Sequence, residues 1–367
     1  MIRLVVISEL TGGGVESVNT TLAQNINQEF FDVTVLSVHS IPKDLTEINP
    51  SYKCVSLNRT SIKRSCLKII ITLRRIQPDI ILCSILDEAF VCLLYKKLYN
   101  RRCKLLYAQH TVWSTVYNTG FKGRVFNKWL PHITNIYSKL DGLIYVSEGV
   151  RDDFRREFKK VKTIERVIYN PITADDSHFL FRILKQNKVS IVTAGRLEKE
   201  KRQKLLIAAA KKLKDEGVDV DITFYGKGTL LGDLKRYSEE LGMREQVRFP
   251  GFIKHLIPAF MQYDIFVLTS DYESFGNVLV EAMNTGMPVV STDCPVGPRE
   301  ILDNGRYGEL VKMRDAESVA KGIKYSIETY NNNKAKDILR RSMDFSIKAS
   351  CSQYENMFMT VLKKQKI

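Results

Sequence analysis

Residues Tyr263–Glu300 have the sequence YDIFVLTSDYESFGNVLVEAMNTGMPVVSTDCPVGPRE, and this stretch decides the fold that we expect. Its pattern predicts four consecutive elements: an apolar strand over Ile265–Thr269, a loop, a helix from about Asn277 that stops at Gly286, and a second buried strand opened by Pro288. Two continuous apolar strands joined through a helix are typical of a parallel sheet covered by helices.

The loop before this helix carries groups that suit a nucleotide sugar. The free N–H groups and the positive dipole end of a helix start favour a phosphate, and Gly276 lets the backbone approach a ligand because it has no Cβ. Glu273 and Glu281 flank these amides, and carboxylates accept hydrogen bonds from ribose and sugar hydroxyls. For two isolated glutamates, dipole compensation and solvent exposure would be the more common explanation, and the context in the rest of the chain reverses this preference.

Length and composition indicate a soluble globular protein. The 367 residues are enough for two or three domains. The seven cysteines are odd in number and have no C-x2-C spacing, which favours reduced core thiols over a disulfide frame or a zinc site. The first apolar run is too short for a secretory signal, and no run approaches the ~18 residues of a membrane span. We therefore expect a cytoplasmic protein.

The remainder of the chain alternates strands and helices, which predicts parallel sheets covered on both faces. In the first half we expect strands over 4–8, 33–38, 80–84, 105–108 and 143–146, and helices over 15–29, 63–76 and 89–99. The alternation pauses near Asn170-Pro171, resumes at Val189, and ends in a helix over about Cys351–Lys364. The pause predicts an interdomain linker.

The segment ESFGNVLVE, Glu273–Glu281, resembles the E-x7-E element of retaining glycosyltransferases with the GT-B fold, and the chain is similar to the bacterial family 4 (group 1) enzymes over nearly its full length. The resemblance implies an α/β fold of two Rossmann-like, doubly wound parallel-sheet domains facing a central cleft. An acceptor-binding domain would span 1–170, with a helix over 351–367 crossing back to it. A donor-binding domain would span 171–350.

In the first domain, Gly12-Gly13-Gly14 follows the first strand but does not match G-x-G-x-x-G, which disfavours a nicotinamide site. A tight turn alone would explain these glycines. The resemblance implies that Gly13 and Gly14 approach the donor diphosphate and the acceptor, and that Glu16 lies near the acceptor. It also implies that His110, after the strand LLYA, contacts the transferred sugar. A lone histidine at a strand end is otherwise most often structural.

In the second domain, Arg196 and Lys201 follow the strand SIVTA and offer a planar donor fork and a point charge to a diphosphate. The resemblance implies that this Arg and Lys neutralise the negative charge that develops on the leaving nucleotide diphosphate. Because Lys199, Arg202 and Lys204 lie close by in the sequence, a basic turn that is simply exposed to solvent is the alternative. The spacing favours Lys201 as the lysine of the diphosphate-binding pair.

The resemblance also implies donor-binding roles for a further set of residues: Gly226, Phe252, Ser274, Phe275, Gly276, Asn277 and Glu281. Gly226 lies in the loop YGKG, where Lys227 departs from the family's usual acidic or polar residue and a simple turn is the alternative. For Phe252, core packing is the more common role than stacking on a base.

Trp113, Tyr117 and Phe121 are interleaved with Lys122, Arg124 and Lys128. We interpret this segment as a flexible lip for a lipid-linked or oligosaccharide acceptor, with a surface loop and helix as the alternative. The net charge of +15, most of which lies in residues 1–170, favours an anionic membrane surface as a partner, although a solvated basic face fits the composition equally. The expected location is therefore the cytoplasm, with the inner face of the cytoplasmic membrane as a candidate partner surface.

The resemblance implies a retaining hexosyltransferase that moves a hexose or N-acetylhexosamine from a nucleotide sugar to a lipid-linked or oligosaccharide acceptor in surface polysaccharide synthesis, such as lipopolysaccharide, O-antigen or capsule. The segment Pro295–Glu300 is similar to P-x-G-P-R-E variants that are common in family enzymes assembling surface polysaccharides, which favours a UDP-sugar donor, although a rigid Pro/Gly turn explains part of it. The family reacts by front-face substitution, in which the leaving phosphate oxygen takes the acceptor's proton. No D-x-D motif occurs in a metal-binding context, so we expect neither a metal nor a cofactor beyond the donor.

Two rival functions remain. A nucleotide-sugar epimerase would use the same nucleotide pocket, and product analysis without an acceptor separates the two reactions. A non-catalytic scaffold of a membrane-associated glycan assembly complex would not bind UDP. Nucleic acid is not an expected partner, because the basic residues match no known nucleic-acid-binding module.

Overall fold

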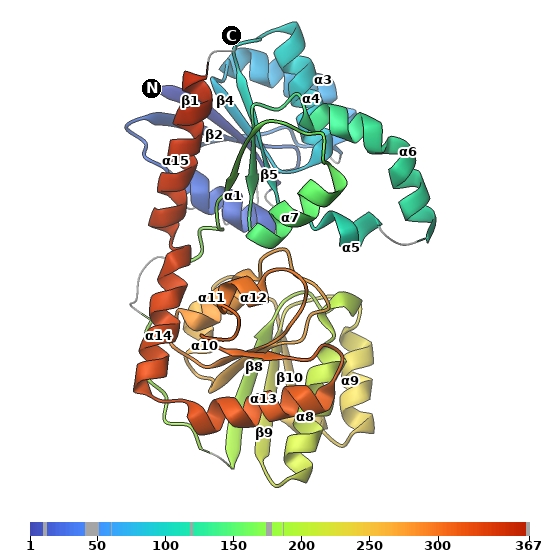
Figure 1. The fold of residues 1–367 in the computed structure, drawn as a ribbon, viewed down its shortest axis with the longest axis vertical. Helices are drawn as coiled ribbons and strands as arrows, with labels where there is room; N and C mark the ends of the chain where they lie inside the picture. The colour runs from blue at the N-terminus through green and yellow to red at the C-terminus, as the bar shows by residue number, and fades with distance from the viewer. Residues whose placement is uncertain are drawn as a thin grey trace. The chain divides into compact units, whose positions relative to one another are not determined.

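The computed structural model describes residues 1–9, 13–40, 51–59, 61–117, 120–173, 178–185 and 187–364, without the side chains of 63 and 116–127. The chain forms two compact units, Met1–Pro171 with Ile347–Ile367, and Ile172–Ser346 (Figure 1). All seven cysteines are free thiols, and five of them are buried.

The first unit is built on a seven-stranded parallel sheet with the order β3-β2-β1-β4-β5-β6-β7. Its strands are β1 (Ile2–Ile7), β2 (Phe31–Ser37), β3 (Lys53–Ser56), β4 (Ile80–Cys83), β5 (Lys104–Gln109), β6 (Gly142–Tyr145) and β7 (Ile164–Val167). Its helices are α1 (Gly14–Asn25), α3 (Ile62–Ile76), α4 (Leu86–Leu98), α5 (Trp113–Tyr117), α6 (Gly120–Tyr137), α7 (Glu148–Glu157) and α15 (Ile347–Lys363).

Helix α15 comes from the end of the chain and packs in the core of this first unit. Its buried side chains join those of β1, β2 and β4 in one apolar cluster, and the Phe358 ring meets the Phe31 ring edge-on at 5.9 Å. The helix begins at Ile347, four residues before the expected start at Cys351.

The second unit has a six-stranded parallel sheet with the order β10-β9-β8-β11-β12-β13. Its strands are β8 (Lys188–Ala194), β9 (Asp219–Tyr225), β10 (Val247–Gly251), β11 (Ile265–Leu268), β12 (Val289–Thr292) and β13 (Glu309–Val311). Its α-helices are α8 (Gln203–Asp215), α9 (Leu231–Glu240), α10 (Leu256–Phe260), α11 (Asn277–Met283), α12 (Pro298–Ile301), α13 (Ala316–Thr329) and α14 (Asn332–Ser342), and its 3-10 helices are η1 (Lys199–Lys201), η2 (Arg244–Gln246) and η3 (Met343–Phe345).

The strands that the sequence analysis did not predict in the first unit, β3 and β7, are the two edges of its sheet. Their residues are exposed or only partly buried, so they lack the continuous apolar run of a central strand. Because β7 exists, β6 is not the last strand of this unit. Ser147 after β6 caps α7, since its side chain accepts a hydrogen bond from the backbone N–H of Val150.

The order of the strands fixes where a ligand can bind. In the second unit β8 lies between β9 and β11. The chain runs from β8 outward to β9 and β10, and the connection after β10 then returns to β11 on the other side of β8, so the order of the strands reverses at β8. Open parallel sheets bind ligands outside the carboxyl ends of their strands at such a switch point. The loops that follow β8 and β11 therefore define the candidate site.

Candidate functional site

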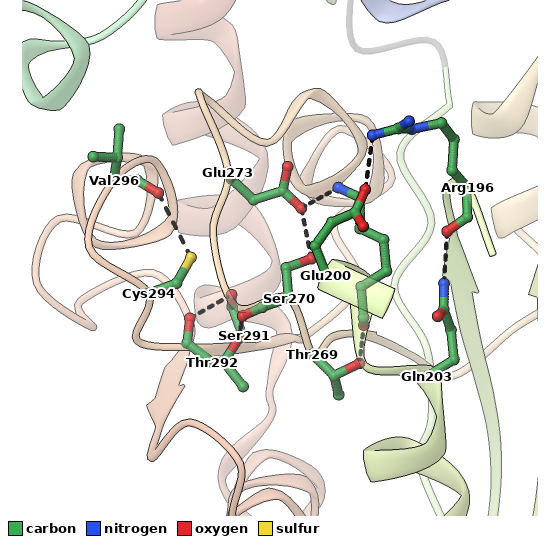
Figure 2. Close-up of polar contacts among 11 residues, drawn as sticks. Arg196, Glu200, Gln203, Thr269, Ser270, Glu273, Ser291, Thr292, Cys294 and Val296 are labelled. Atoms are coloured by element: carbon green, nitrogen blue, oxygen red, sulfur yellow. Dashed lines mark hydrogen bonds and ion pairs between the residues drawn. The ribbon is translucent and has the colours of Figure 1, made fainter. Parts of the chain in front are cut away.

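A buried ion pair joins the two loops at the switch point. Lys201, in η1 after β8, places its Nζ 2.6 Å from Oε1 of Glu273, in the loop after β11. The Ser270 hydroxyl donates to the same carboxylate oxygen at 2.7 Å (Figure 2). Both side chains of the pair are mostly buried, so this contact is held in position more firmly than a surface salt bridge.

Arg196 lies in the same loop as Lys201 but is far more exposed, with 73% of its side chain accessible. Its Nη2 donates to Oε1 of Glu200 at 2.8 Å, and its backbone oxygen accepts a hydrogen bond from Nε2 of the buried Gln203 at 2.7 Å (Figure 2). The sequence analysis missed Glu200. The spacing of four residues from Arg196 was the available signal, but that spacing supports an ion pair only where a helix is expected.

Two other cations of this basic turn, Arg202 and Lys204, have partners elsewhere. Arg202 has a left-handed backbone, with φ +51°, and donates to Asp271, which also accepts from Arg314. Lys204 lies 5.0 Å from the centre of the Tyr237 ring. Of the basic side chains from Lys199 to Lys204, Lys201 is the one that the structure brings to Glu273.

The loop of Ser274, Phe275 and Gly276 leads into α11, which is only seven residues long. Gly276 has φ +110°, so glycine is required there by its backbone conformation. The sequence analysis had explained it by close approach to a ligand. The Phe275 ring is buried and meets Phe345 edge-on at 5.4 Å, so this side chain packs in the interior. Ser274 and Asn277 both have polar or electrostatic partners in the protein.

Glu281 lies in the second turn of α11 and differs from Glu273 in having no cation beside it in the described part of the chain. Burial raises the pKa of the Glu281 carboxyl to about 7, because removal from water disfavours its charged form. Near neutral pH the side chain is therefore divided between a neutral acid and a carboxylate.

Gly226 and Phe252 follow β9 and β10, the strands beside β8. A Cβ at Gly226 would lie 1.9 Å from the backbone oxygen of Gly195, so a glycine is needed for the turns after β9 and β8 to pack together. The Phe252 side chain is 55% exposed, which shows that the expected core packing of this ring is wrong.

The remaining predicted site residues belong to the first unit. The Glu16 carboxylate accepts a hydrogen bond from the backbone N–H of Gly13, the residue before α1, and so caps the start of that helix. A Cβ at Gly14 would meet nothing within 4 Å. Gly12 lies outside the described residues.

His110 directly follows β5, and its Nε2 is buried without a hydrogen-bond partner among the described residues. Burial lowers its pKa to about 4, so the imidazole is neutral at physiological pH. A satisfied structural histidine, the alternative given above, is not what this geometry shows. An unpartnered buried nitrogen is instead suited to a polar ligand atom.

The expected lip is partly wrong. Trp113 is only 4% exposed and packs edge-on against the rings of Tyr137 and Phe158, because α5 turns it into the interior. The side chains of Tyr117, Phe121, Lys122 and Arg124 lie outside the described residues. Lys128 is exposed, as is Trp129 on α6, which the sequence analysis did not single out.

Neither a metal-ligating cluster nor a membrane-spanning helix occurs in the part of the chain that the structure describes. Across the described ranges, no three His, Cys, Asp or Glu side chains gather as they would around a metal ion. No helix in those ranges has both the length and the apolar character needed to cross a membrane.

Comparison with known proteins identifies relatives of both units. Residues 12–176 match the family model Glycosyltransferase Family 4, and residues 177–342 match Glycosyl transferases group 1. The N-acetylgalactosamine-N,N'-diacetylbacillosaminyl-diphospho-undecaprenol 4-alpha-N-acetylgalactosaminyltransferase of Campylobacter jejuni is 25% identical, over 90% of this chain and 91% of that protein. An uncharacterized 41.2 kDa protein in the cps region of Klebsiella pneumoniae is also 25% identical, over 89% and 91% of the two chains.

Solved structures match over both units as well. A glycosyltransferase from Rickettsia africae has a TM-score of 0.80 at 18% identity, covering 99% of each chain. Anabaena Alr3699/HepE, solved with UDP and glucose, has a TM-score of 0.78 at 20% identity, covering 98% of this chain and 100% of that one. These likenesses and the two parallel sheets identify the fold as GT-B. The chain belongs to the group 1, family 4 type of glycosyltransferases.

Proposed function

We propose that this protein is a retaining, metal-independent glycosyltransferase that moves a hexose or N-acetylhexosamine from a UDP-sugar to a lipid-linked or oligosaccharide acceptor in surface polysaccharide synthesis. The observation that carries the proposal is the contact between Lys201 and Glu273 at the switch point of the second unit, with Arg196 in the same loop. A fixed cation beside a carboxylate is suited to a ligand that has both phosphates and hydroxyls.

Arg196 and Lys201 would hold the donor diphosphate. Each is paired with a glutamate, so binding exchanges a carboxylate oxygen for a phosphate oxygen and keeps the cation in a charge-assisted hydrogen bond. Lys201 is held in place before the reaction, and a fixed charge directed at a developing negative charge stabilises a transition state. Here that charge grows on the leaving diphosphate.

The carboxylates would bind the hydroxyls of the donor. We assign the sugar hydroxyls to Glu273, which lies beside Lys201, and the ribose diol to Glu281. A diol donates two hydrogen bonds and favours the charged form of Glu281, whose pKa of about 7 leaves it ready to release a proton when the donor binds. We also assign the loop of Phe275 and Gly276, which leads into α11, to the diphosphate.

For the first unit, we assign His110 to the transferred sugar. Its neutral imidazole can accept a hydrogen bond from a hydroxyl or donate one, but it does not act as a cation at physiological pH. Gly13 and Gly14 remain candidates for backbone contacts with substrate. Glu16 is used by the cap of α1, which makes a direct contact with the acceptor a secondary role.

The proposed reaction keeps the configuration of the anomeric carbon. The bond between this carbon and the leaving phosphate oxygen breaks, and the acceptor oxygen bonds to the same face of the carbon. The leaving phosphate oxygen takes the acceptor's proton, so no general base of the protein is required. Positioning of the two substrates and charge stabilisation then supply the rate acceleration.

The assignment of donor and acceptor draws on named relatives. The Campylobacter jejuni relative is named for transfer of N-acetylgalactosamine to a diphospho-undecaprenol-linked sugar, and the Klebsiella pneumoniae relative is encoded in a cps region. The Anabaena structure was solved with UDP and glucose. These names support UDP as the donor nucleotide and a lipid-linked glycan as the acceptor, which would bring the enzyme to the cytoplasmic face of a membrane.

The test is a screen of UDP- and GDP-linked sugars with synthetic lipid-linked acceptors, in which the product is analysed by NMR. We expect transfer from one UDP-sugar, a product with the anomeric configuration of the donor, and an unchanged rate in the presence of a metal chelator. A product of inverted configuration would refute retention, and a chelator-sensitive rate would refute metal independence. Isomerised donor formed without an acceptor would indicate an epimerase.

A further inference from the structure

Helices α3 and α6 of the first unit both lie beside α4 (Figure 1). Each of the three helices exposes large apolar side chains. Leu67 and Ile71 on α3 are 76% and 49% exposed, and Phe90 on α4 and Trp129 on α6 are 50% and 56% exposed. Single exposed apolar residues are ordinary, but large ones gathered on adjacent helices indicate an interaction site. We refer to the exposed side chains of these three helices as the α3–α4–α6 surface.

A groove of about 990 Å³ lies between α4 and α6. Its walls are largely aliphatic and aromatic, and include Phe90, Leu93 and Leu94 of α4 and Trp129, Ile133 and Ile136 of α6. An open apolar groove of this volume can receive a flexible hydrocarbon chain, which would remove the walls from water.

Basic side chains line the same groove. Lys97 belongs to the last turn of α4, Arg101 follows that helix, and Lys139 follows α6. Lys96 is neutralised by an ion pair with Asp141, whereas Lys97, Arg101 and Lys139 have no ion-pair partner within the described ranges. The apolar groove therefore has a cationic border, although Asp87 is also among its lining residues.

The exposed face of α3 continues this combination of residues. Exposed residues recur there at the three- and four-residue spacing of one helix face: Arg64, Leu67 or Lys68, Ile71, and Arg74 or Arg75. The Arg74 guanidinium lies 5.2 Å from the centre of the Tyr99 ring, just beyond α4, and so joins the two helices. Apolar side chains flanked by lysine and arginine are typical of helices that lie in a membrane interface.

We propose that the α3–α4–α6 surface docks on an anionic phospholipid bilayer, with a hydrocarbon chain entering the groove between α4 and α6. Charge complementarity favours this occupant, because a bilayer presents anionic headgroups beside apolar chains. A second copy of the chain would bring like charges together. The biological role of docking rests on the proposed function, since a lipid-linked acceptor lies in such a bilayer, but the docking itself requires neither donor nor acceptor.

The first experiment is co-sedimentation of the full chain with vesicles of equal parts phosphatidylglycerol and phosphatidylcholine, and with vesicles of phosphatidylcholine alone. We expect binding to the anionic vesicles that weakens as salt rises from about 0.1 M to about 1 M, where the screening length falls from about 10 Å to about 3 Å. Equal affinity for the two kinds of vesicle would overturn the proposal.

Paired variants test the surface itself. Each basic residue near an anionic membrane contributes roughly fivefold to binding, so Lys97→Glu with Arg101→Glu should weaken binding by about 25-fold or more. Phe90→Ser with Trp129→Ser should also weaken it. The matched control is Ile183→Ser with Lys235→Glu, which alters an exposed apolar residue and an exposed basic residue of the second unit and should leave binding unchanged. Wild-type affinity in both surface variants would contradict the assignment.

Fluorescence locates the contact, because the chain has two tryptophans, the buried Trp113 and the exposed Trp129. Phospholipids brominated in their chains should quench the emission of the wild type, and Trp129→Phe should abolish most of that quenching. Sedimentation velocity in the absence of lipid tests the rival occupant. A dimer that the Phe90 and Trp129 substitutions dissociate would assign the surface to a second copy and overturn the proposal.

UDP binding separates this proposal from the proposed function. Surface variants that lose vesicle binding should still bind UDP like the wild type. A wild type that binds vesicles but not UDP would leave the docking proposal standing and refute the proposed donor site.

Discussion

Arg196 and Lys201 are each paired with a carboxylate, yet their surroundings differ. The Lys201–Glu273 pair is mostly buried, whereas Arg196 is exposed and meets Glu200 at its tip. Arg196 can therefore swing to a ligand with little loss of packing, while Lys201 acts from a fixed position. We infer that Lys201 sets the position of the donor and that Arg196 closes onto it.

Arg196→Ala is the corresponding test. Loss of a charged donor that stabilises a developing anion lowers the rate by about 100- to 1000-fold, and the exposure of Arg196 implies little change in stability. The matched control is Lys199→Ala, an exposed cation of the same turn, which should transfer sugar at nearly the wild-type rate. Steady-state kinetics on both variants measures the transfer rate, and circular dichroism measures their stability. Equal rates for Arg196→Ala and the wild type would remove Arg196 from the mechanism.

Glu281 predicts a pH dependence of donor binding. Its raised pKa of about 7 means that the free protein carries a proton there below pH 7, and ribose hydroxyls favour the charged form. Affinity for UDP-glucose should thus fall by up to about tenfold per pH unit below pH 7 and level off above it. Calorimetry at several pH values should show this slope in the wild type and none in Glu281→Gln. The same slope in both proteins would contradict the role.

At the residue scale, the sequence predicted types of residue better than their surroundings. Lys201 and Glu273 were predicted separately, and the structure brings them together. The exposure of Phe252 and the burial of Trp113 could not be foreseen, because both depend on how neighbouring elements pack. Glu200 was missed since its partner lies in an irregular turn.

At the scale of elements, glycines near the site allow loops to pack. Gly226, after β9, contacts the backbone of Gly195 in the loop after β8, whereas a Cβ at Gly232, in α9, would meet no atom within 4 Å. Replacement of glycine by alanine should therefore have opposite effects on stability at these two positions.

Gly226→Ala should destabilise the second unit by about 2 kcal/mol or more, because its Cβ would meet backbone and its φ of +139° disfavours alanine. Gly232→Ala should stabilise it by about 0.5–1 kcal/mol through helix propensity. Denaturant unfolding of both variants measures the difference. An equal effect at both positions would show that the turn after β9 is not packed as described.

Glu88 caps α4, where its Oε2 accepts hydrogen bonds from the backbone N–H groups of Ser84 and Ile85. Burial raises its pKa to about 8, so the folded state keeps a proton that the unfolded state releases near pH 4.5. The free energy of unfolding should thus fall as pH rises from about 4.5 to about 8, by at most ~1.4 kcal/mol per unit.

Glu88→Gln keeps an acceptor at this cap but cannot ionise. Its unfolding free energy should vary less between pH 5 and pH 8 than that of the wild type, and at pH 8 the variant should be the more stable protein. Urea denaturation at these two pH values is the measurement. Parallel pH profiles would show that the Glu88 carboxyl is not held neutral.

The elements themselves were predictable where burial is complete. Central strands such as β4 and β11 are continuous apolar runs, and they were predicted within a residue or so of their bounds. The edge strands β3 and β7 were missed because one side of an edge strand needs no apolar cover.

At the scale of the whole molecule, the chain end stabilises the unit in which the chain begins. Phe358 of α15 is fully buried against Phe31, and the next residue, Met359, is 39% exposed. These two neighbours on one helix offer a matched pair of substitutions.

Phe358→Ala should destabilise the first unit by about 3–5 kcal/mol, whereas Met359→Ala should have little effect. Calorimetric unfolding with and without UDP distinguishes the two units. UDP at 100 times its Kd stabilises the unit that binds it by about 2.7 kcal/mol. We expect Phe358→Ala to lower the unfolding transition of the first unit, and UDP to raise the transition of the second unit. If UDP shifts the transition that Phe358→Ala lowers, the donor site has been assigned to the wrong unit.

The sequence predicted the GT-B fold because alternating apolar strands and helices define parallel sheets, and the E-x7-E segment indicated the family. It did not predict the α3–α4–α6 surface. That surface combines residues from three helices, and only packing decides which of their apolar side chains stay exposed.

The most direct test of the account is calorimetric titration of the full chain with UDP, in the wild type and in Lys201→Ala. We predict one UDP bound per chain, and an affinity at least about tenfold lower in the variant, in keeping with the loss of a charge-assisted hydrogen bond. A wild type that binds no UDP, or a Lys201→Ala variant that binds it equally well, would contradict a diphosphate held at the switch point of the second unit.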